Sequence, residues 1–260
     1  MTRRFGALLA VLLLVVCAAG PAAAAERESR VVGGSEISIE QAPYTVAIAD
    51  APPILLPGDG FDRFFCGGSI VAPTLVITAA HCLDGAGGLL DFGFPEDPSD
   101  FTAITGRTTL SSEQGKEIEL AEIYFFGDSG SGPEHIASSA PGDPDPLYDP
   151  DEAPVWDVLL LELSEPVEAP AAPLLLAGAG EEATWAPGQG AVVAGWGATS
   201  EGGDPSDTLR SALVAMIADS TCAGAYPSPG TTIEFRPETQ VCAGIIFQGG
   251  ADACQGDSGG

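Results

Sequence analysis

The sequence predicts an all-β fold, and three features of the chain support this prediction. Short apolar or alternating stretches recur along the chain, Gly and Pro separate them, and no apolar repeat of helical period is sustained. The 260 residues include 34 Gly and 22 Pro, which supply the turns that many short strands need. This pattern is typical of a β-barrel or a β-sandwich.

Five stretches carry the strand signal. Residues 45–49 and 117–123 alternate, as expected for strands with one buried face, and residues 75–78 are rich in β-branched side chains. Residues 158–163 and 191–194 are compact apolar runs. We expect a strand at each.

The segments between these strands have other signatures. Residues 219–225 are the one expected short helix, and residues 166–190, rich in Ala, Pro and Gly, suit a linker between two halves of the chain. Residues 84–100 and 127–154 are expected to be long surface loops, and the second holds seven carboxylates and six prolines. Neither loop has the regular ligand spacing of a calcium loop, so we expect solvated acidic surface there, and calcium binding by the loops stays an open alternative. We assign no metal ligands and expect no cofactor.

The charge balance excludes one class of partner. Nine Lys and Arg stand against 37 Asp and Glu, which gives a net charge of −28. A nucleic-acid-binding protein needs clustered cations to replace the counterions of the phosphates. DNA and RNA are therefore not expected partners.

The first 25 residues have the pattern of a secretory signal peptide. Arg3 and Arg4 precede an apolar run, and small residues at 22–25 suit a cleavage site. The run is short for a membrane-spanning helix, and Cys17 would leave with the signal. We therefore expect a secreted, extracellular protein that does not associate with a membrane.

Five cysteines remain beyond the expected signal, and they are Cys66, Cys82, Cys222, Cys242 and Cys254. Export to an oxidising compartment makes disulfides the expected state. Because five is an odd number, either one thiol stays free or the partner of Cys254 lies in sequence beyond Gly260.

Three segments contain the residues of hydrolytic serine chemistry. His81 directly follows a predicted strand, Asp157 directly precedes another, and Ser258 lies among glycines. A serine nucleophile needs a base to take its proton, a carboxylate to orient that base, and backbone N–H groups to stabilise the oxyanion. Each residue alone has an ordinary structural explanation, but the three together supply every part. His135, in the acidic loop, is expected to be a solvated surface residue.

Several motifs together resemble the chymotrypsin-like serine proteases, and the trypsin group in particular. Residues 30–34 (RVVGG) resemble the family's activation cleavage site, and residues 65–70 (FCGGSI) resemble the strand before its histidine. Residues 194–197 (AGWG) resemble the start of its second barrel, and residues 252–260 (DACQGDSGG) resemble its nucleophile segment. The resemblance covers about residues 30 to 260.

The resemblance implies two six-stranded antiparallel β-barrels, the first at about residues 31–165 and the second at about residues 185–260, with the active site between them. His81 would be the general base, Asp157 would orient it, and Ser258 would be the nucleophile. The N–H groups of Gly256 and Ser258 would form the oxyanion hole.

The resemblance also implies a substrate preference and a mode of activation. Asp252 matches the acid at the base of the primary specificity pocket, which implies cleavage of protein or peptide substrates after Arg or Lys. Cleavage after Arg30 would remove a propeptide of residues 26–30, and the new α-amino group of Val31 would pair with Asp257. The protein would then be a monomeric serine endopeptidase made as a zymogen, and protein protease inhibitors would be further partners.

In the family pattern, Cys66 pairs with Cys82, Cys222 pairs with Cys242, and the partner of Cys254 lies after the nucleophile. The similarity stops two residues after Ser258, so we expect a fragment whose second barrel lacks its C-terminal part. Two other functions remain open at this point. They are a non-catalytic protease homologue that acts as a binding protein, and a fragment that is inactive as written.

Overall fold

A computed structural model of the chain describes residues 34–52, 58–83, 97–126, 136–137, 157–200, 202–226, 235–245 and 253–260. The expected signal peptide and propeptide, and most of the two acidic loops, lie outside these residues. Among the described residues, no helix has the length and apolar character needed to cross a membrane.

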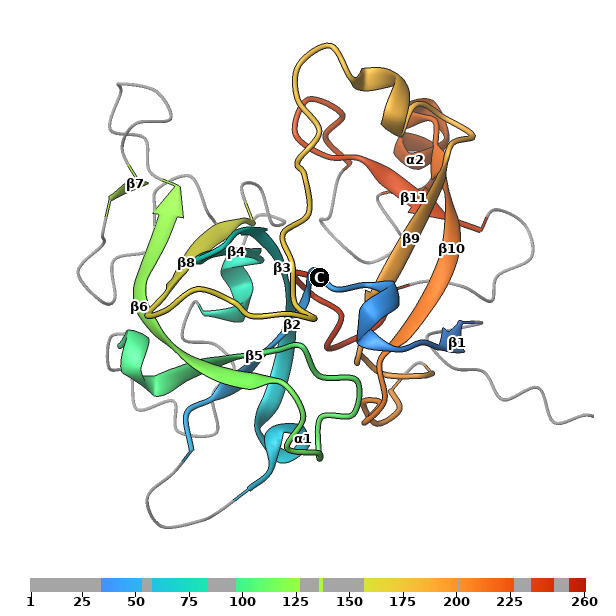
Figure 1. Cartoon of the computed structure of the whole chain (residues 1–260). Helices are drawn as coiled ribbons and strands as arrows, with labels where there is room; N and C mark the ends of the chain where they lie inside the picture. The colour runs from blue at the N-terminus through green and yellow to red at the C-terminus, as the bar shows by residue number, and fades with distance from the viewer. Residues whose placement is uncertain are drawn as a thin grey trace, which may run out of the picture.

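Two antiparallel sheets make up the fold (Figure 1). The first contains β2 (Thr45–Asp50), β3 (Phe64–Ala72), β4 (Leu75–Thr78), β5 (Phe101–Thr105), β6 (Lys116–Phe126), β7 (Ile136–Ala137) and β8 (Leu159–Leu163). The second contains β1 (Ser35–Glu36), β9 (Gly190–Gly195), β10 (Arg210–Ile217) and β11 (Cys242–Gly244). The helices are α1 (Gly60–Arg63) and α2 (Asp219–Ala225), with short 3₁₀ turns at Ile39–Gln41, Ala80–Cys82, Pro98–Asp100 and Glu182–Trp185.

The first sheet closes into a barrel, which confirms the predicted all-β fold. Its strands follow the order β5-β2-β3-β4-β8-β6, and a pairing between β5 and β6 joins the two ends. In the second sheet, β10 pairs with β9 along one side and with β1 and β11 along the other. Within the described part of the chain, this second sheet has four strands and stays open.

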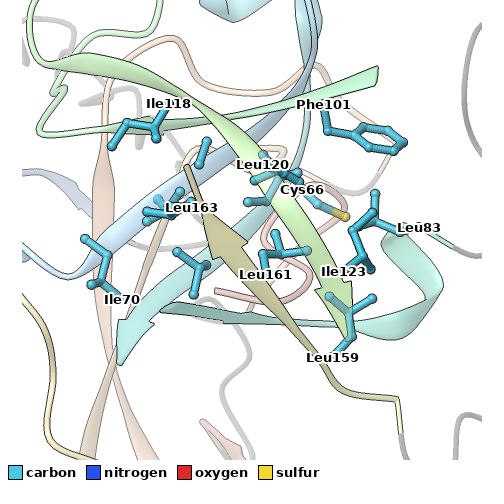
Figure 2. Close-up of a cluster of buried hydrophobic side chains, with 14 of the residues drawn as sticks. Cys66, Ile70, Leu83, Phe101, Ile118, Leu120, Ile123, Leu159, Leu161 and Leu163 are labelled. Carbon is cyan, nitrogen blue, oxygen red and sulfur yellow. The ribbon is translucent and has the colours of Figure 1, made fainter. Parts of the chain in front are cut away.

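The barrel interior is filled by alternating side chains of its strands, as Figure 2 shows. On β2, Val46 and Ile48 face this core, whereas Ala47 and Ala49 face a second buried cluster. Both faces of β2 are therefore buried, because successive side chains of a strand point in opposite directions. The barrel core includes Ile70, Val76, Ile118, Leu120, Ile123, Leu159, Leu161 and Leu163.

The second buried cluster joins the two halves of the molecule around Trp196. This side chain is fully buried, and its Nε1–H donates to the carbonyl oxygen of Thr108 at 3.1 Å. The ring of Phe64, from β3 of the barrel, meets it edge-on with centroids 6.3 Å apart. The indole thus contributes a large apolar contact and one satisfied polar group to the joint.

Most expected elements are confirmed, and the differences have physical reasons. The five predicted strands and the helix at 219–225 are present. Periodicity missed β10, because its exposed positions include Leu213 and apolar residues thus occur on both faces. Periodicity also missed β5, in which all five residues are buried and no alternation is visible.

Two assignments need correction. The first barrel was expected to begin at about residue 31, but β1 pairs with β10 of the second sheet, so this segment crosses to the other half. Within the acidic stretch 127–154, expected to be entirely loop, β7 pairs with the end of β6. The pairing of β1 with β10 joins segments far apart in sequence, and β7 lies in a stretch without an apolar pattern. Local residue preferences predict neither pairing.

Two buried arginines of the first barrel share one carboxylate. Arg63 donates to Glu117 at 2.7 Å and Arg107 donates to Glu117 at 2.9 Å. The arginine side chains are 7% and 5% exposed. Partial burial acts to raise the pKa of Glu117, but the hydrogen bonds and charges of the two arginines outweigh it and hold that pKa below its usual value.

We predict that Glu117→Gln destabilises the protein by about 3 kcal/mol at pH 7, because it leaves two buried guanidinium groups without their anion. A depressed carboxyl pKa stabilises the fold above the unfolded pKa, and that contribution is lost as the pH falls through the folded pKa. The difference between wild type and variant should therefore shrink below about pH 4. Urea unfolding at pH 7 and pH 3 measures it, with Glu165→Gln in the exposed Lys116 pair as a control expected to change little.

Candidate active site

The pairing of β4 with β8 brings His81 and Asp157 together. The two strands are antiparallel and Thr78 lies opposite Leu159, so the chain leaving β4 and the chain entering β8 meet at one edge. His81 follows β4 in a 3₁₀ turn, and Asp157 lies two residues before β8. The barrel therefore positions both side chains without any contribution from the second sheet.

The Asp157 carboxylate holds His81 at two points. Oδ2 lies 2.7 Å from the ring Nδ1, and Oδ1 accepts a hydrogen bond of 2.8 Å from the backbone N–H of His81. An ionised carboxylate only accepts, so this contact places the ring proton on Nδ1 and leaves Nε2 as the basic nitrogen. The His81 side chain is 42% exposed and that of Asp157 is 18% exposed.

Asp157 is ionised at neutral pH. Burial acts to raise its pKa, but the hydrogen bonds from the ring and backbone of His81 outweigh burial, so the net shift is downward. An acid in this state orients the imidazole and stabilises its protonated form.

A disulfide between Cys66 and Cys82 clamps the histidine turn to β3. Its two sulfur atoms and a ring nitrogen of His81 lie within 4.8 Å of one another. Oxidised sulfurs provide no thiolate, so this group is not a zinc site. The second disulfide links Cys222 of α2 with Cys242 of β11. These are the two pairs that the family resemblance implies, and Cys254 forms no disulfide within the described residues.

The segment with Ser258 reaches the barrel from the other half. The carbonyl oxygen of Ser258 accepts a hydrogen bond of 2.8 Å from the backbone N–H of Gly67 on β3. The same oxygen lies 3.9 Å from the sulfur of Cys82, next to His81 in sequence. Thr78 of β4 donates from its hydroxyl to the Gly67 carbonyl at 2.7 Å, which ties β4 to the same residue of β3. The serine turn is thus held against the two strands that precede the histidine.

On its other side, this turn is bound to the second half. Asp257, which is 8% exposed, accepts hydrogen bonds from the backbone N–H groups of Gly197 at 2.8 Å and Cys254 at 3.0 Å. Burial raises the pKa of Asp257 against the opposing effect of these two donors. Ala198 also donates to the carbonyl of Gln255 at 2.7 Å. Figure 1 shows the chain end, marked C, between the two sheets.

A small hollow opens beside Gly256. Its volume is about 130 Å³, and residues from both halves line it. Phe64 and Phe65 come from β3 of the barrel, and Ala198, Gly203 and Pro205 come from the loop after β9. The surface next to the serine turn is therefore concave where the two halves meet.

Four further predicted residues lie outside the described part of the chain, and they are Asp252, Arg30, Val31 and His135. Sequence reasoning missed Gly67 and Thr78, which support the serine turn. The Gly-Gly pair at 67–68 within an apolar strand was the available signal, because glycine inside a strand often marks close backbone approach.

Comparison with known proteins identifies the family. The family model described as Trypsin matches residues 31–260. The chain belongs to the trypsin family. A trypsin of Saccharopolyspora erythraea is 36% identical over 230 residues, covering 88% of this chain and 80% of its own. A trypsin of Simulium vittatum is 34% identical over 256 residues, covering 98% of this chain and 85% of its own.

Solved structures agree with this assignment. Neuropsin, a serine protease expressed in the limbic system of mouse brain, superimposes with a TM-score of 0.58 at 26% identity, over 87% of this chain and 79% of that one. Human heparin binding protein has the same fold, with a TM-score of 0.60 at 23% identity over 87% of this chain and 77% of that one. The protein is thus a serine protease of the trypsin family, whose substrates are proteins.

We predict that Gly259→Ala displaces the serine turn. Gly259 has φ of +82°, and an added Cβ would lie 2.6 Å from the Gly67 carbonyl oxygen and 2.8 Å from the Ala79 nitrogen. Gly202 is a matched control, because it also has positive φ (+66°) but nothing lies within 4 Å of an added Cβ. Gly202→Ala should cost only about 1 kcal/mol of backbone strain. Gly259→Ala should in addition slow labelling of Ser258 by a fluorophosphonate probe by at least about tenfold.

Equal labelling rates for the two glycine variants would contradict this role of the turn. Urea unfolding of both variants separates a displaced turn from general loss of stability.

Proposed function

We propose that this protein is a secreted serine endopeptidase that hydrolyses peptide bonds after Arg or Lys. The observation that carries the proposal is the double contact of one Asp157 carboxylate with the ring and the backbone of His81, two residues 76 positions apart in the chain. An orienting acid must fix both the position and the tautomer of its base, and the contacts to the backbone N–H and to Nδ1 do these two things.

In the proposed mechanism, Nε2 of His81 takes the proton of the Ser258 hydroxyl as that oxygen attacks the substrate carbonyl carbon. The N–H groups of Gly256 and Ser258 stabilise the oxyanion that forms. His81 then gives the proton to the leaving amine, which leaves the acyl-enzyme. In the second half of the reaction, His81 takes a proton from water as the water attacks the acyl carbon, and it returns that proton to the Ser258 oxygen. The hydrogen bond from Gly67 to the Ser258 carbonyl supports this assignment, because it restrains the backbone of the nucleophile.

Activation forms the second part of the proposal. The protein is made as a zymogen that is cleaved after Arg30, and the α-amino group of Val31 then pairs with Asp257. The burial of Asp257 supports this scheme, since a carboxylate that is 8% exposed gains from a cationic partner. Among the described residues, no ion pair of Asp257 is present. The protein acts outside the cell as a monomer, and protein protease inhibitors would compete with its substrates.

The triad is tested in the full-length, activated protein by Asp157→Asn. The carboxylate oxygen that accepts from Nδ1–H can be replaced by an NH2 group, which donates. This favours the imidazole tautomer with its proton on Nε2, which cannot act as the base, so kcat should fall about 10⁴-fold. Asp97→Asn is a matched control, because Asp97 also accepts hydrogen bonds from a backbone N–H and a side chain, but both donors belong to Ser99 and not to a predicted site residue.

Labelling of Ser258 by a serine-directed covalent inhibitor distinguishes the enzyme from a non-catalytic binding homologue. An activated wild-type protein that is neither labelled nor able to hydrolyse a peptide would reject the endopeptidase.

The cleavage preference is tested with reporter peptides that end in Arg, Lys, Phe or Ala. We expect Asp252 to favour the cationic residues by about 10²-fold or more in kcat/KM, because a neutral side chain would leave a buried carboxylate unpaired. Asp252→Ser should remove this preference while leaving the rate of Ser258 labelling near that of wild type. Turnover of the Phe peptide equal to that of the Arg peptide would show that the preference is wrong.

A further inference from the structure

Arg210 connects the N-terminal segment to the second sheet from a buried position. Its side chain is 4% exposed. Nη1 donates to the Glu36 carboxylate at 3.1 Å, and Nη2 donates to the carbonyl oxygen of Gly34 at 3.1 Å. Its Nε–H is buried without a hydrogen-bond partner among the described residues. An arginine in this position binds a segment whose own strand, β1, is only two residues long.

One residue from each of the strands β1, β10 and β9 lies in a row across the second sheet, and the last residue of the row contacts Asp257. Glu36 lies opposite Arg210, and Arg210 lies opposite Gly195 of β9. Residues directly opposite each other in a sheet point to the same face. A Cβ built on Gly195 would meet three side-chain atoms of Asp257 within 4 Å, so the row faces that carboxylate.

Distances along the chain agree with this arrangement. Neighbouring strands are about 4.8 Å apart, so the backbone of Glu36 is about 10 Å from that of Gly195. Val31 precedes Glu36 by five residues, which span at most about 17 Å when extended. The α-amino group of Val31 can therefore reach Asp257 while Glu36 stays bound to Arg210.

We propose that Arg210 is a positioning residue for activation, which holds the segment behind the new N-terminus so that the ammonium group of Val31 is delivered to Asp257. This inference rests on the zymogen scheme of the proposed function. Anchoring at Gly34 and Glu36 fixes the segment that follows residue 33, so insertion need not order that segment, and fewer ordered residues mean a smaller entropic cost.

The titratable groups around the insertion site are Asp257 and the Cys254 thiol on the serine turn, Arg210 on β10 and Glu36 on β1. The inserted amine has a raised pKa because it pairs with Asp257, so the active form is lost as the pH rises through that value. A weaker anchor lowers the insertion equilibrium, and the alkaline limb of activity then moves to lower pH.

The test compares wild type with Arg210→Gln in full-length precursor that has been cleaved after Arg30, with cleavage verified by mass spectrometry. The Val31 amine of the variant should react with cyanate at least about tenfold faster. The variant loses the charge-assisted hydrogen bonds to Glu36 and Gly34, and even one of them is equivalent to about that factor in the insertion equilibrium. The alkaline midpoint of kcat/KM should fall by about one pH unit.

Arg107→Gln is the matched control, because Arg107 is equally buried and also binds a carboxylate, but within the first barrel. It should lower the melting temperature and leave both the cyanate reaction and the alkaline midpoint at wild-type values. Arg210→Lys should give intermediate values, since an ammonium group reaches one of the two acceptors at a time. Glu36→Gln, which removes only the ion pair, provides the same readouts if Arg210→Gln does not fold.

The positioning role is wrong if Arg210→Gln has the wild-type cyanate reaction rate and the wild-type alkaline midpoint. The same holds for Glu36→Gln if Arg210→Gln does not fold. Either result would leave the zymogen scheme intact. The positioning role and the zymogen scheme are both rejected if the Val31 amine of the cleaved wild-type protein reacts with cyanate as fast when folded as when unfolded in urea.

Discussion

The joint around Trp196 is the constraint on which the rest of the structure depends. Its fully buried indole lies between the closed barrel and the second sheet, with Phe64 against its edge and Thr108 as its hydrogen-bond acceptor. Gly197, the next residue, donates to Asp257 and so fixes the turn that carries Ser258. Docking of the halves and placement of the serine are therefore one event, and a cavity at this joint would disturb both.

Three arginines are buried inside the described part of the fold, and each binds a carboxylate. Arg63 and Arg107 share Glu117 in the barrel wall, and Arg210 binds Glu36 at the edge of the second sheet. With a net charge of −28, the protein has a strong negative field, which favours solubility and attracts cationic segments of other proteins. A protease that prefers Arg or Lys in its substrates would gain faster encounters from such a field, and the gain would diminish with added salt.

Much of the fold could be predicted from local patterns, because most strands bury one face and expose the other. The approach failed where that rule does not hold. Every residue of β5 is buried, and β10 exposes Leu213 beside its buried face, so neither has the expected alternation. The site residues His81, Asp157 and Ser258 could be proposed because their motifs are compact. Thr78 and Arg210 could not, since each acts only through a partner elsewhere in the chain, and for Gly67 the Gly-Gly pair indicated a close backbone approach but not its partner.

The sequence alone determined the chemical groups of this protein and their order: an imidazole, a carboxylate and a hydroxyl, each at the end of a short apolar or glycine-rich segment. Tertiary structure alone decided how they are connected. It placed both oxygens of Asp157 on His81, the Ser258 carbonyl on Gly67, and the N-terminal strand on β10 rather than on the barrel. The reason is physical: strand register and hydrogen bonds between distant segments depend on which surfaces meet, and a local stretch of sequence specifies its own conformation but not its partner.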